Sequence, residues 1–172
     1  NDPMYIRSRK GLGYLPQQPS VFAKMNVEDN ILSVLETLNY SKSRQISELD
    51  NLISDFGLNK IRKTKANLLS GGERRRLEIA RAISNNPKFI LLDEPFAGVD
   101  PIAVQDIQYM INKLKSKNIG VLITDHNVRE TLSITDRSYL LYDGKVLKSG
   151  KTSDLVNDSE VRRLYLGQNF KF

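Results

Sequence analysis

The adjacent acids Asp93 and Glu94 are the strongest candidates for chemistry in this chain of 172 residues. They follow the apolar run 89–92, which lies between Pro87 and Pro95 and predicts a fully buried strand. In open α/β sheets, ligands bind just beyond the carboxyl ends of the strands. Asp93 could hold Mg²⁺, which prefers hard oxygen ligands, and Glu94 could orient a water molecule or accept its proton. The alternative is a strand that ends in solvated acids.

A second candidate is the segment 69–73, Leu-Ser-Gly-Gly-Glu, at the start of a predicted helix. Gly71 and Gly72 would let a phosphate approach the backbone, where N–H groups and the helix dipole favour an anion. Ser70 adds a hydroxyl donor, and its spacing from Glu73 is that of a capping box. The same residues are also compatible with a capped helix that follows a flexible loop.

Two single residues complete the candidates. His126 follows a second apolar run at 119–124 and could reach a phosphate oxygen, although a lone histidine is more often structural. Gln17 follows a short strand candidate at 13–15, and its amide could position water or ligate Mg²⁺; an exposed loop glutamine is the alternative. The lone histidine excludes a multi-histidine metal site, and the absence of cysteine excludes disulfides and thiolate chemistry.

Helices and strands must hold these side chains in place. Residues 1–26 read as irregular apart from that short strand. Apolar spacing predicts amphipathic helices over 27–38 and 46–56, with Asn26 as N-cap and Gly57 closing the second. A basic loop at 59–67 precedes the helix that starts at Ser70. Further elements are a helix from Asp100-Pro101, a second buried strand at 119–124, a hairpin of 137–142 with 145–149, and one or two short terminal helices.

The strand, helix and strand between residues 89 and 124 form a βαβ crossover, which predicts parallel strands in an α/β layer fold. No apolar run approaches the ~20 residues that span a bilayer, and no secretory signal peptide is recognisable. The net charge of +6 suits an acidic partner such as nucleic acid, a membrane surface or nucleotide phosphates, and does not choose among them.

The order and spacing of the candidates resemble those of the ATP-binding cassette (ABC) ATPases. The resemblance implies an α/β, RecA-like P-loop NTPase domain over residues 1–172, with a helical subdomain at 27–68. It also implies ATP and Mg²⁺ as cofactors and a head-to-tail homodimer. The implied roles are catalysis by Glu94, His126 and Gln17; Mg²⁺ binding by Asp93 and Gln17; contact with the ATP of the other subunit by the signature Ser70, Gly71, Gly72 and Glu73; and the D-loop Asp100.

Longer strings resemble the ATPase subunits of lipopolysaccharide exporters, among them 13–17, 69–76, 89–101, 124–131 and the end at 165–167 with Phe170. This implies an ATP hydrolase that is peripheral on the cytoplasmic face of the inner membrane and bound to transmembrane permease subunits, with no nucleic acid. It would power lipopolysaccharide extraction and transport to the outer membrane. Phe22 would anchor a permease coupling helix, although Ala23 stands where that family usually has arginine. The alternative for Phe22 is packing under the helical subdomain.

No G-x-x-x-x-G-K-[ST] phosphate loop occurs in the chain. We therefore expect a C-terminal fragment of a longer protein, inactive by itself and poorly soluble because part of its sheet is exposed. Other classes stay open: another ABC ATPase such as that of a branched-chain amino acid importer, or a degenerate regulatory cassette. A DNA-repair ATPase would need a long coiled coil between Gln17 and Ser70, and no sustained heptads occur there. A translation-type twin cassette would need a second copy.

Overall fold

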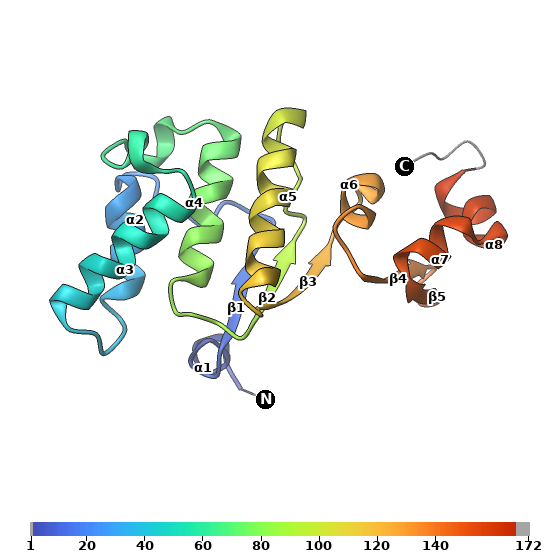
Figure 1. Ribbon diagram of the computed structural model, residues 1–172, viewed down its shortest axis with the longest axis horizontal. Coiled ribbons are helices and arrows are strands. Elements are labelled where there is room, and N and C mark those ends of the chain that lie inside the picture. The colour runs from blue at the N-terminus through green and yellow to red at the C-terminus, as the bar shows by residue number, and fades with distance from the viewer. Residues whose placement is uncertain (1, 168–172) are drawn as a thin grey trace. The chain divides into compact units, whose positions relative to one another are not determined.

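The computed structural model describes residues 2–167 and divides the chain into two compact units (Figure 1). The first unit extends to Asp125, and the second begins at His126. Each unit is described by itself. Within the described residues, every helix is too short or too polar to cross a bilayer.

The first unit is built on a parallel sheet in the order β1-β2-β3, formed by Leu12–Leu15, Phe89–Asp93 and Gly120–Thr124. Its register places Leu15 beside Leu92 and Asp93 beside Thr124. The parallel β2–β3 pair and the crossover helix between them confirm the predicted βαβ unit. All three strands end at the same edge, so their carboxyl ends bring distant parts of the sequence together.

Helices α4 (Gly71–Ile83) and α5 (Pro101–Ser116) pack against this sheet (Figure 1). Ile90 and Leu92 are fully buried on the face where α4 lies. The predictions that β2 is fully buried and that β3 is buried are wrong, because Phe89 on β2 and Leu122 on β3 are 42% and 47% exposed. Successive side chains of a strand point to opposite faces, and α4 and α5 cover one of them.

Helices α2 (Val27–Leu35) and α3 (Lys42–Asp55) lie beside α4 and are largely as predicted. The Asn26 side chain accepts a hydrogen bond from the Asp29 N–H at 2.8 Å and caps α2. Gly57 closes the second helix with a positive φ of 62°. Four differences appear. Helix α2 ends at Leu35 rather than 38, and α3 begins at Lys42 rather than 46. Ile46 is exposed rather than inward, and the loop 59–67 contains 3₁₀ turns at Asn59–Ile61 (η1) and Ala66–Leu68 (η2).

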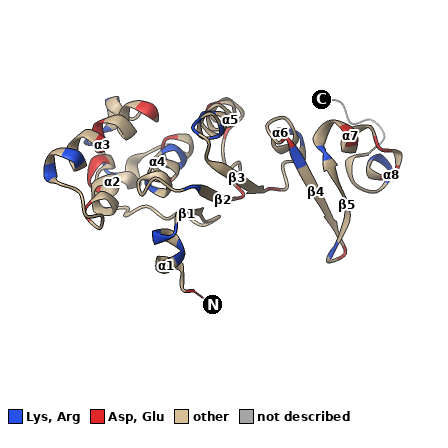
Figure 2. Cartoon of the chain, turned by 60° about the horizontal axis from the view of Figure 1, so that its bottom comes forward, with Lys and Arg blue, Asp and Glu red and all other residues tan. Residues whose placement is uncertain are grey.

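The first residues are more ordered than predicted, because helix α1 (Met4–Arg9) forms where the sequence reads as irregular. No side chain of α1 is fully buried, so no apolar periodicity marks it. Basic and acidic residues are interspersed over α2, α3 and α4 (Figure 2). Part of the basic excess is neutralised locally, as where Arg62 pairs with Glu28 at 2.6 Å.

The second unit contains the predicted hairpin, β4 (Arg137–Tyr142) paired antiparallel with β5 (Lys145–Lys151). Asp143 and Gly144 both have positive φ, which a two-residue turn of type I′ requires. Helix α6 (Val128–Leu132) precedes the hairpin, and the elements after it are α7 (Thr152–Asn157), α8 (Ser159–Val161) and the turn η3 (Arg162–Leu166). Its small core comprises Leu140, Leu155 and Val161. Phe170, part of the predicted resemblance, lies outside the described residues.

Candidate functional site

The structure brings Gln17 and Glu94 together at the carboxyl edge of the parallel sheet. The Gln17 Nε2 atom donates a hydrogen bond of 2.7 Å to Glu94 Oε2, although the two residues follow different strands. Beside them, the Thr124 hydroxyl donates to Asp93 Oδ1 at 2.6 Å. The predicted pair of acids and the predicted glutamine therefore share one site, while their catalytic roles stay predictions.

Glu94 adopts a backbone conformation that is uncommon for a residue with a side chain. Its φ is +43°, in the left-handed region, and its N–H donates to the Thr124 carbonyl at 2.7 Å. Its own carbonyl accepts from the Ala97 N–H at 3.1 Å. Holding a residue with a side chain in this region costs free energy, and residues held in this way concentrate at functional sites. The bonds from the neighbouring strand and turn hold Glu94 in this position at the end of β2.

Arg75 on α4, which is not among the residues predicted from the sequence, holds this edge together. Its side chain is 7% exposed, and its guanidinium donates to the carbonyls of Pro16, Asp93, Glu94 and Pro95 at 2.8–3.2 Å. It also pairs with the Glu78 carboxylate at 2.9 Å. One cation thus links α4 to the backbone on both sides of the Gln17–Glu94 contact. One feature of the sequence could have identified this pair. Arg75 and Glu78 carry opposite charges three residues apart, on the side of the helix that also carries the buried Gly72 and Ile79.

Glu78 and Arg81 extend these contacts along α4. Glu78 is 3% exposed, and its Oε1 accepts from the Ser20 N–H at 3.1 Å. Arg81 donates to the carbonyl of Ser20 and, at 3.1 Å, to that of Asn30. Burial lowers the pKa of Arg81, an effect that the charge of Glu78 opposes. Both side chains therefore fix the loop that follows Gln17.

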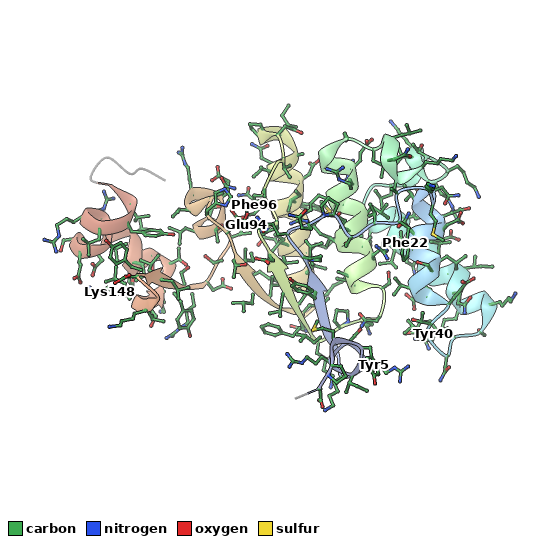
Figure 3. All side chains as sticks on the ribbon, turned by 180° about the vertical axis from the view of Figure 1, so that it is seen from behind. Tyr5, Phe22, Tyr40, Glu94, Phe96 and Lys148 are labelled. Carbon is green, nitrogen blue, oxygen red and sulfur yellow. The ribbon has the colours of Figure 1, made fainter. Side chains whose placement is uncertain are left out.

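Phe22 lies at the far end of this loop, beside α2 (Figure 3). Its side chain is 51% exposed, and the Arg81 guanidinium lies over the ring, 4.7 Å from its centroid. The fully buried Asn30 fixes the backbone there, since its side chain accepts from the Phe22 N–H at 2.8 Å and donates to the Phe22 carbonyl at 3.1 Å. Phe22 is thus presented at the surface from a rigid base, and its coupling role stays a prediction.

The N-terminus of α4 has the predicted capping box. The Ser70 Oγ accepts from the Glu73 N–H at 3.3 Å, and the Ser70 N–H donates to Glu73 Oε2 at 2.9 Å. Hydrogen bonds from the Ser70 backbone and hydroxyl lower the pKa of Glu73. The Ser70 hydroxyl donates to Glu73 Oε2 at 2.8 Å, so the donor predicted for a phosphate is engaged within the cap in this structure.

The two signature glycines pack against the segment that carries Asp100. A Cβ added to Gly72 would lie 2.7 Å from the Ala103 Cβ, and one added to Gly71 would lie 3.3 Å from the Gly98 carbonyl oxygen. Asp100 caps α5, with its Oδ1 accepting from the N–H groups of Ile102 and Ala103 at 3.1 and 3.0 Å. The start of α4 and the start of α5 are therefore in direct contact, and glycine permits that approach.

His126 opens the second unit, two residues after β3 ends. The residue before it, Asp125, belongs to the first unit, where its Oδ2 accepts from the Phe96 N–H at 3.1 Å. The Phe96 ring is buried, so this bond fixes the turn that follows Glu94. The predicted role of His126 as a phosphate contact is not tested by these contacts.

The residues of this edge suit Mg²⁺ as part of a larger set of ligands. The described residues contain no group of three or more acidic, histidine or cysteine side chains that could hold a metal ion. Mg²⁺ bound with nucleotides uses one or two carboxylates, and phosphate and water oxygens supply the rest. Asp93 offers a carboxylate, and the amide oxygen of Gln17 is left as a ligand because its nitrogen donates to Glu94.

Comparison with known proteins gives consistent results. A family model described as ABC transporter matches residues 2–97. The chain is 56% identical to the lipopolysaccharide export system ATP-binding protein of Acidithiobacillus ferridurans, covering 98% of this chain and 70% of that one. It is 47% identical to the protein of the same description from Escherichia coli K12, with the same coverages. It is also 56% identical to an uncharacterised ABC transporter ATP-binding protein of Rhizobium meliloti, covering 98% of this chain and 62% of that one.

Solved structures agree with the fold. An ATP-binding cassette of an ABC transporter in its ADP conformation superposes with a TM-score of 0.79 and 26% identity, covering 98% of this chain and 72% of that one. A dimeric cassette bound to ADP and phosphate superposes with a TM-score of 0.75 and 23% identity, covering 88% of this chain and 68% of that one. This chain spans between 60% and 70% of the length of the first sequence relatives it matches.

Proposed function

The chain belongs to the ABC transporter family of ATP-binding proteins, and we propose that its gene product is the ATP-hydrolysing subunit of a lipopolysaccharide exporter. The observation that supports ATP hydrolysis is the 2.7 Å hydrogen bond between Gln17 and Glu94 at the carboxyl edge of the sheet. The lipopolysaccharide part rests on 47–56% identity to proteins described as lipopolysaccharide export system ATP-binding proteins.

In this proposal Glu94 orients the attacking water and accepts its proton. The left-handed backbone of Glu94 and the hydrogen bond from Gln17 hold the carboxylate in place before substrate arrives, so little reorganisation is needed. Asp93, kept in position by the Thr124 hydroxyl, and the Gln17 amide oxygen would hold Mg²⁺, which supplies charge neutralisation of the phosphates. His126 would contact the γ-phosphate.

The signature at the start of α4 would serve the ATP of a second copy in a head-to-tail homodimer. Gly71 and Gly72 leave the backbone N–H groups at the helix N-terminus open to close approach, and the helix dipole favours a phosphate there. Ser70 and Glu73 shape that terminus through the capping box. Asp100, whose helix abuts Gly72, would contribute the D-loop to the same interface.

Phe22 would receive a helix of a transmembrane permease. An aromatic side chain that is half exposed yet fixed from beneath loses little conformational freedom on binding, which suits an anchor. Residues 27–68 would form the helical subdomain beside it. The subunit would then act peripherally on the cytoplasmic face of the inner membrane.

The test uses the gene product read from the genomic frame that contains these residues, since the 172 residues include no phosphate-binding loop and would not hydrolyse ATP by themselves. Glu94→Gln should lower ATP hydrolysis by about 10²–10⁴-fold, the usual contribution of a general base. Nucleotide binding should persist, because the change is isosteric. Glu36→Gln, at an exposed carboxylate after α2, is the matched control and should hydrolyse at the wild-type rate.

A second measurement identifies the transported substrate independently of ATP hydrolysis. The gene product is reconstituted with its permease in vesicles that contain lipopolysaccharide, and ATP-dependent extraction is followed. Extraction that stops in Glu94→Gln supports the full proposal. Hydrolysis without extraction, accompanied by uptake of a branched-chain amino acid, would instead assign the subunit to an importer. Absence of hydrolysis in the wild-type complex would favour a regulatory cassette.

A further inference from the structure

A cavity of about 650 Å³ lies at the amino edge of the parallel sheet, opposite the edge that contains Gln17 and Glu94. Two of its lining residues, Gly11 and Lys88, directly precede β1 and β2. Figure 3 shows Tyr5, which also lines it, and Glu94 toward opposite ends of these strands. A ligand in this cavity would therefore leave the carboxyl edge of the sheet free.

The wall of this cavity is positively charged. Arg9, Lys10 and Lys88 line it, and none of the described side chains around it is acidic. Lys10 pairs with the Asp2 carboxylate at 2.5 Å, whereas Arg9 and Lys88 form no ion pair within the part of the chain that the structure describes. Two cations are thus available to an anionic ligand.

Asn85 adds a hydrogen-bond acceptor that has no donor. Its Nδ2 atom donates to the Ser8 carbonyl at 3.2 Å and to the Ser8 hydroxyl at 2.8 Å. Its Oδ1 atom is buried and accepts from no group among residues 2–167. A buried acceptor without a donor costs free energy. A ligand hydroxyl or amino group would supply the missing donor as this side chain turns toward the cavity.

A second cavity, of about 300 Å³, adjoins the first and shares Tyr5, Ser8, Val34 and Asn85 with it. Apart from Arg81, the residues that line only this second cavity are apolar or aromatic, namely Met4, Leu12, Gly13, Tyr14 and Ala82. Tyr5 is 62% exposed, and the Arg9 guanidinium lies 5.8 Å from its ring centroid, so the charged and aromatic parts adjoin. Volumes of this size are typical of small-molecule sites.

We propose that the two cavities form a binding site for a phosphate ester that carries hydroxyl or amino groups. The phosphate would lie at Arg9 and Lys88, and a hydroxyl or amino group would donate to Asn85. Nucleotides and sugar phosphates share this chemistry, and only a nucleotide has a base that would stack on the exposed Tyr5 ring. The site does not depend on the proposed ATP hydrolysis, because it lies at the other edge of the sheet.

The experiment titrates the isotope-labelled gene product with adenosine monophosphate, ribose phosphate and inorganic phosphate, and follows its amide NMR signals. Both esters should shift the backbone signals of Gly11 and Asn86 and the side-chain amide signals of Asn85, and the shifts should saturate. Inorganic phosphate should bind about 10-fold more weakly, since it makes fewer of these contacts. Any nucleotide that enters the carboxyl edge is recognised separately, because it shifts residues around Glu94 instead.

Lys88→Gln should weaken binding of both esters by about 10-fold, because a charge-assisted hydrogen bond to the phosphate is lost. Glutamine keeps the Cγ that packs beside Gly11, so the fold should persist. Arg9→Gln gives a second reading if Lys88→Gln does not fold. The matched control is Lys60→Gln, at an exposed lysine of η1 that lines neither cavity, and it should bind as wild type. Equal weakening in Lys60→Gln would reveal general attraction to a basic surface and overturn the proposal.

Tyr5→Ala distinguishes the two kinds of ester. A stacked nucleotide should bind wild type about 5- to 100-fold more tightly than ribose phosphate and lose this advantage in Tyr5→Ala. Equal or tighter binding of ribose phosphate would assign the site to sugar phosphates. Inorganic phosphate that binds as tightly as either ester would show an adventitious ion only, and absence of shifts at Gly11 and Asn85 with all three probes would equally reject the site. None of these readouts requires ATP hydrolysis, so failure of the proposed function would leave them unchanged.

Discussion

Replacing Arg75 by methionine should be among the most damaging single changes in this chain. The side chain is 7% exposed and donates to five acceptors, of which Glu78 is charged and also buried. Methionine fills a similar volume and donates to none of them. The change therefore leaves the Glu78 carboxylate and several carbonyl oxygens without their shared donor.

The size of the effect follows from the buried ion pair. Hydrogen bonds to charged groups contribute about 1.5–3 kcal/mol each, but five such terms would equal the whole stability of an ordinary domain, about 5–15 kcal/mol, so they cannot simply be added. Breaking a buried pair costs about 3–5 kcal/mol, because one charge stays uncompensated. We expect Arg75→Met to lower the free energy of unfolding by that amount.

The assay is urea denaturation of the gene product, with the midpoint and the slope both measured. Arg75→Met with Glu78→Leu should recover about half of the lost stability, because no charge is then left unpaired. Hydrolysis by this double variant should still fall about 10²-fold, since the turn after β2 has lost its donor and misplacement of a catalytic group is costly. A single variant within about 1 kcal/mol of wild type, or a double variant less stable than the single, would refute the reasoning.

Three further predictions concern packing, capping and pH. Gly72→Ala should destabilise by about 1–3 kcal/mol, because its Cβ would meet the Ala103 Cβ at 2.7 Å; adding Ala103→Gly should restore the urea midpoint, and no recovery would exclude that contact as the cause. Ser70→Ala should lower the free energy of unfolding by about 1 kcal/mol and Ser70→Gly by a few tenths, measured by the same urea denaturation. Equal stability of wild type and Ser70→Ala would show that the Ser70 cap does not stabilise α4. Hydrogen bonds from Lys63 and Arg62 hold the pKa of Glu28 below its usual 4.5, so its stabilisation is present at neutral pH and is lost as the pH falls through the lowered value. The stability difference between wild type and Glu28→Gln should accordingly shrink below pH 4.5, and a constant difference from pH 7 to 3 would contradict this.

Helix starts and turns could be predicted because their signals are local. Asn26, Ser70 and Asp100 each accept a hydrogen bond from an N–H two or three residues ahead, so residue type and spacing suffice. The hairpin at Asp143-Gly144 needs positive φ at both positions, which these residue types tolerate. The parallel pairing of β2 and β3 followed from the length of the helical segment between them.

The burial of the strands could not be predicted in the same way. An apolar run reads as buried on both faces, yet Phe89 and Leu122 are exposed while Ile90 and Leu92 are covered. Which face is covered depends on where α4 and α5 pack, and that is a property of the whole unit. Helix α1 was missed because it buries no side chain completely and thus has no apolar stripe to recognise.

By itself the sequence determined the identities and order of the candidate site residues and the elements that carry them, because each signal spans a few positions. Only the tertiary structure decided that Gln17 contacts Glu94, that Glu94 lies in the left-handed region, and that Arg75 and Glu78 are buried rather than solvated. These contacts join residues far apart along the chain. They exist because parallel strands end at one edge of a sheet and α4 packs beside it, which places carbonyl oxygens from distant segments around the Arg75 guanidinium.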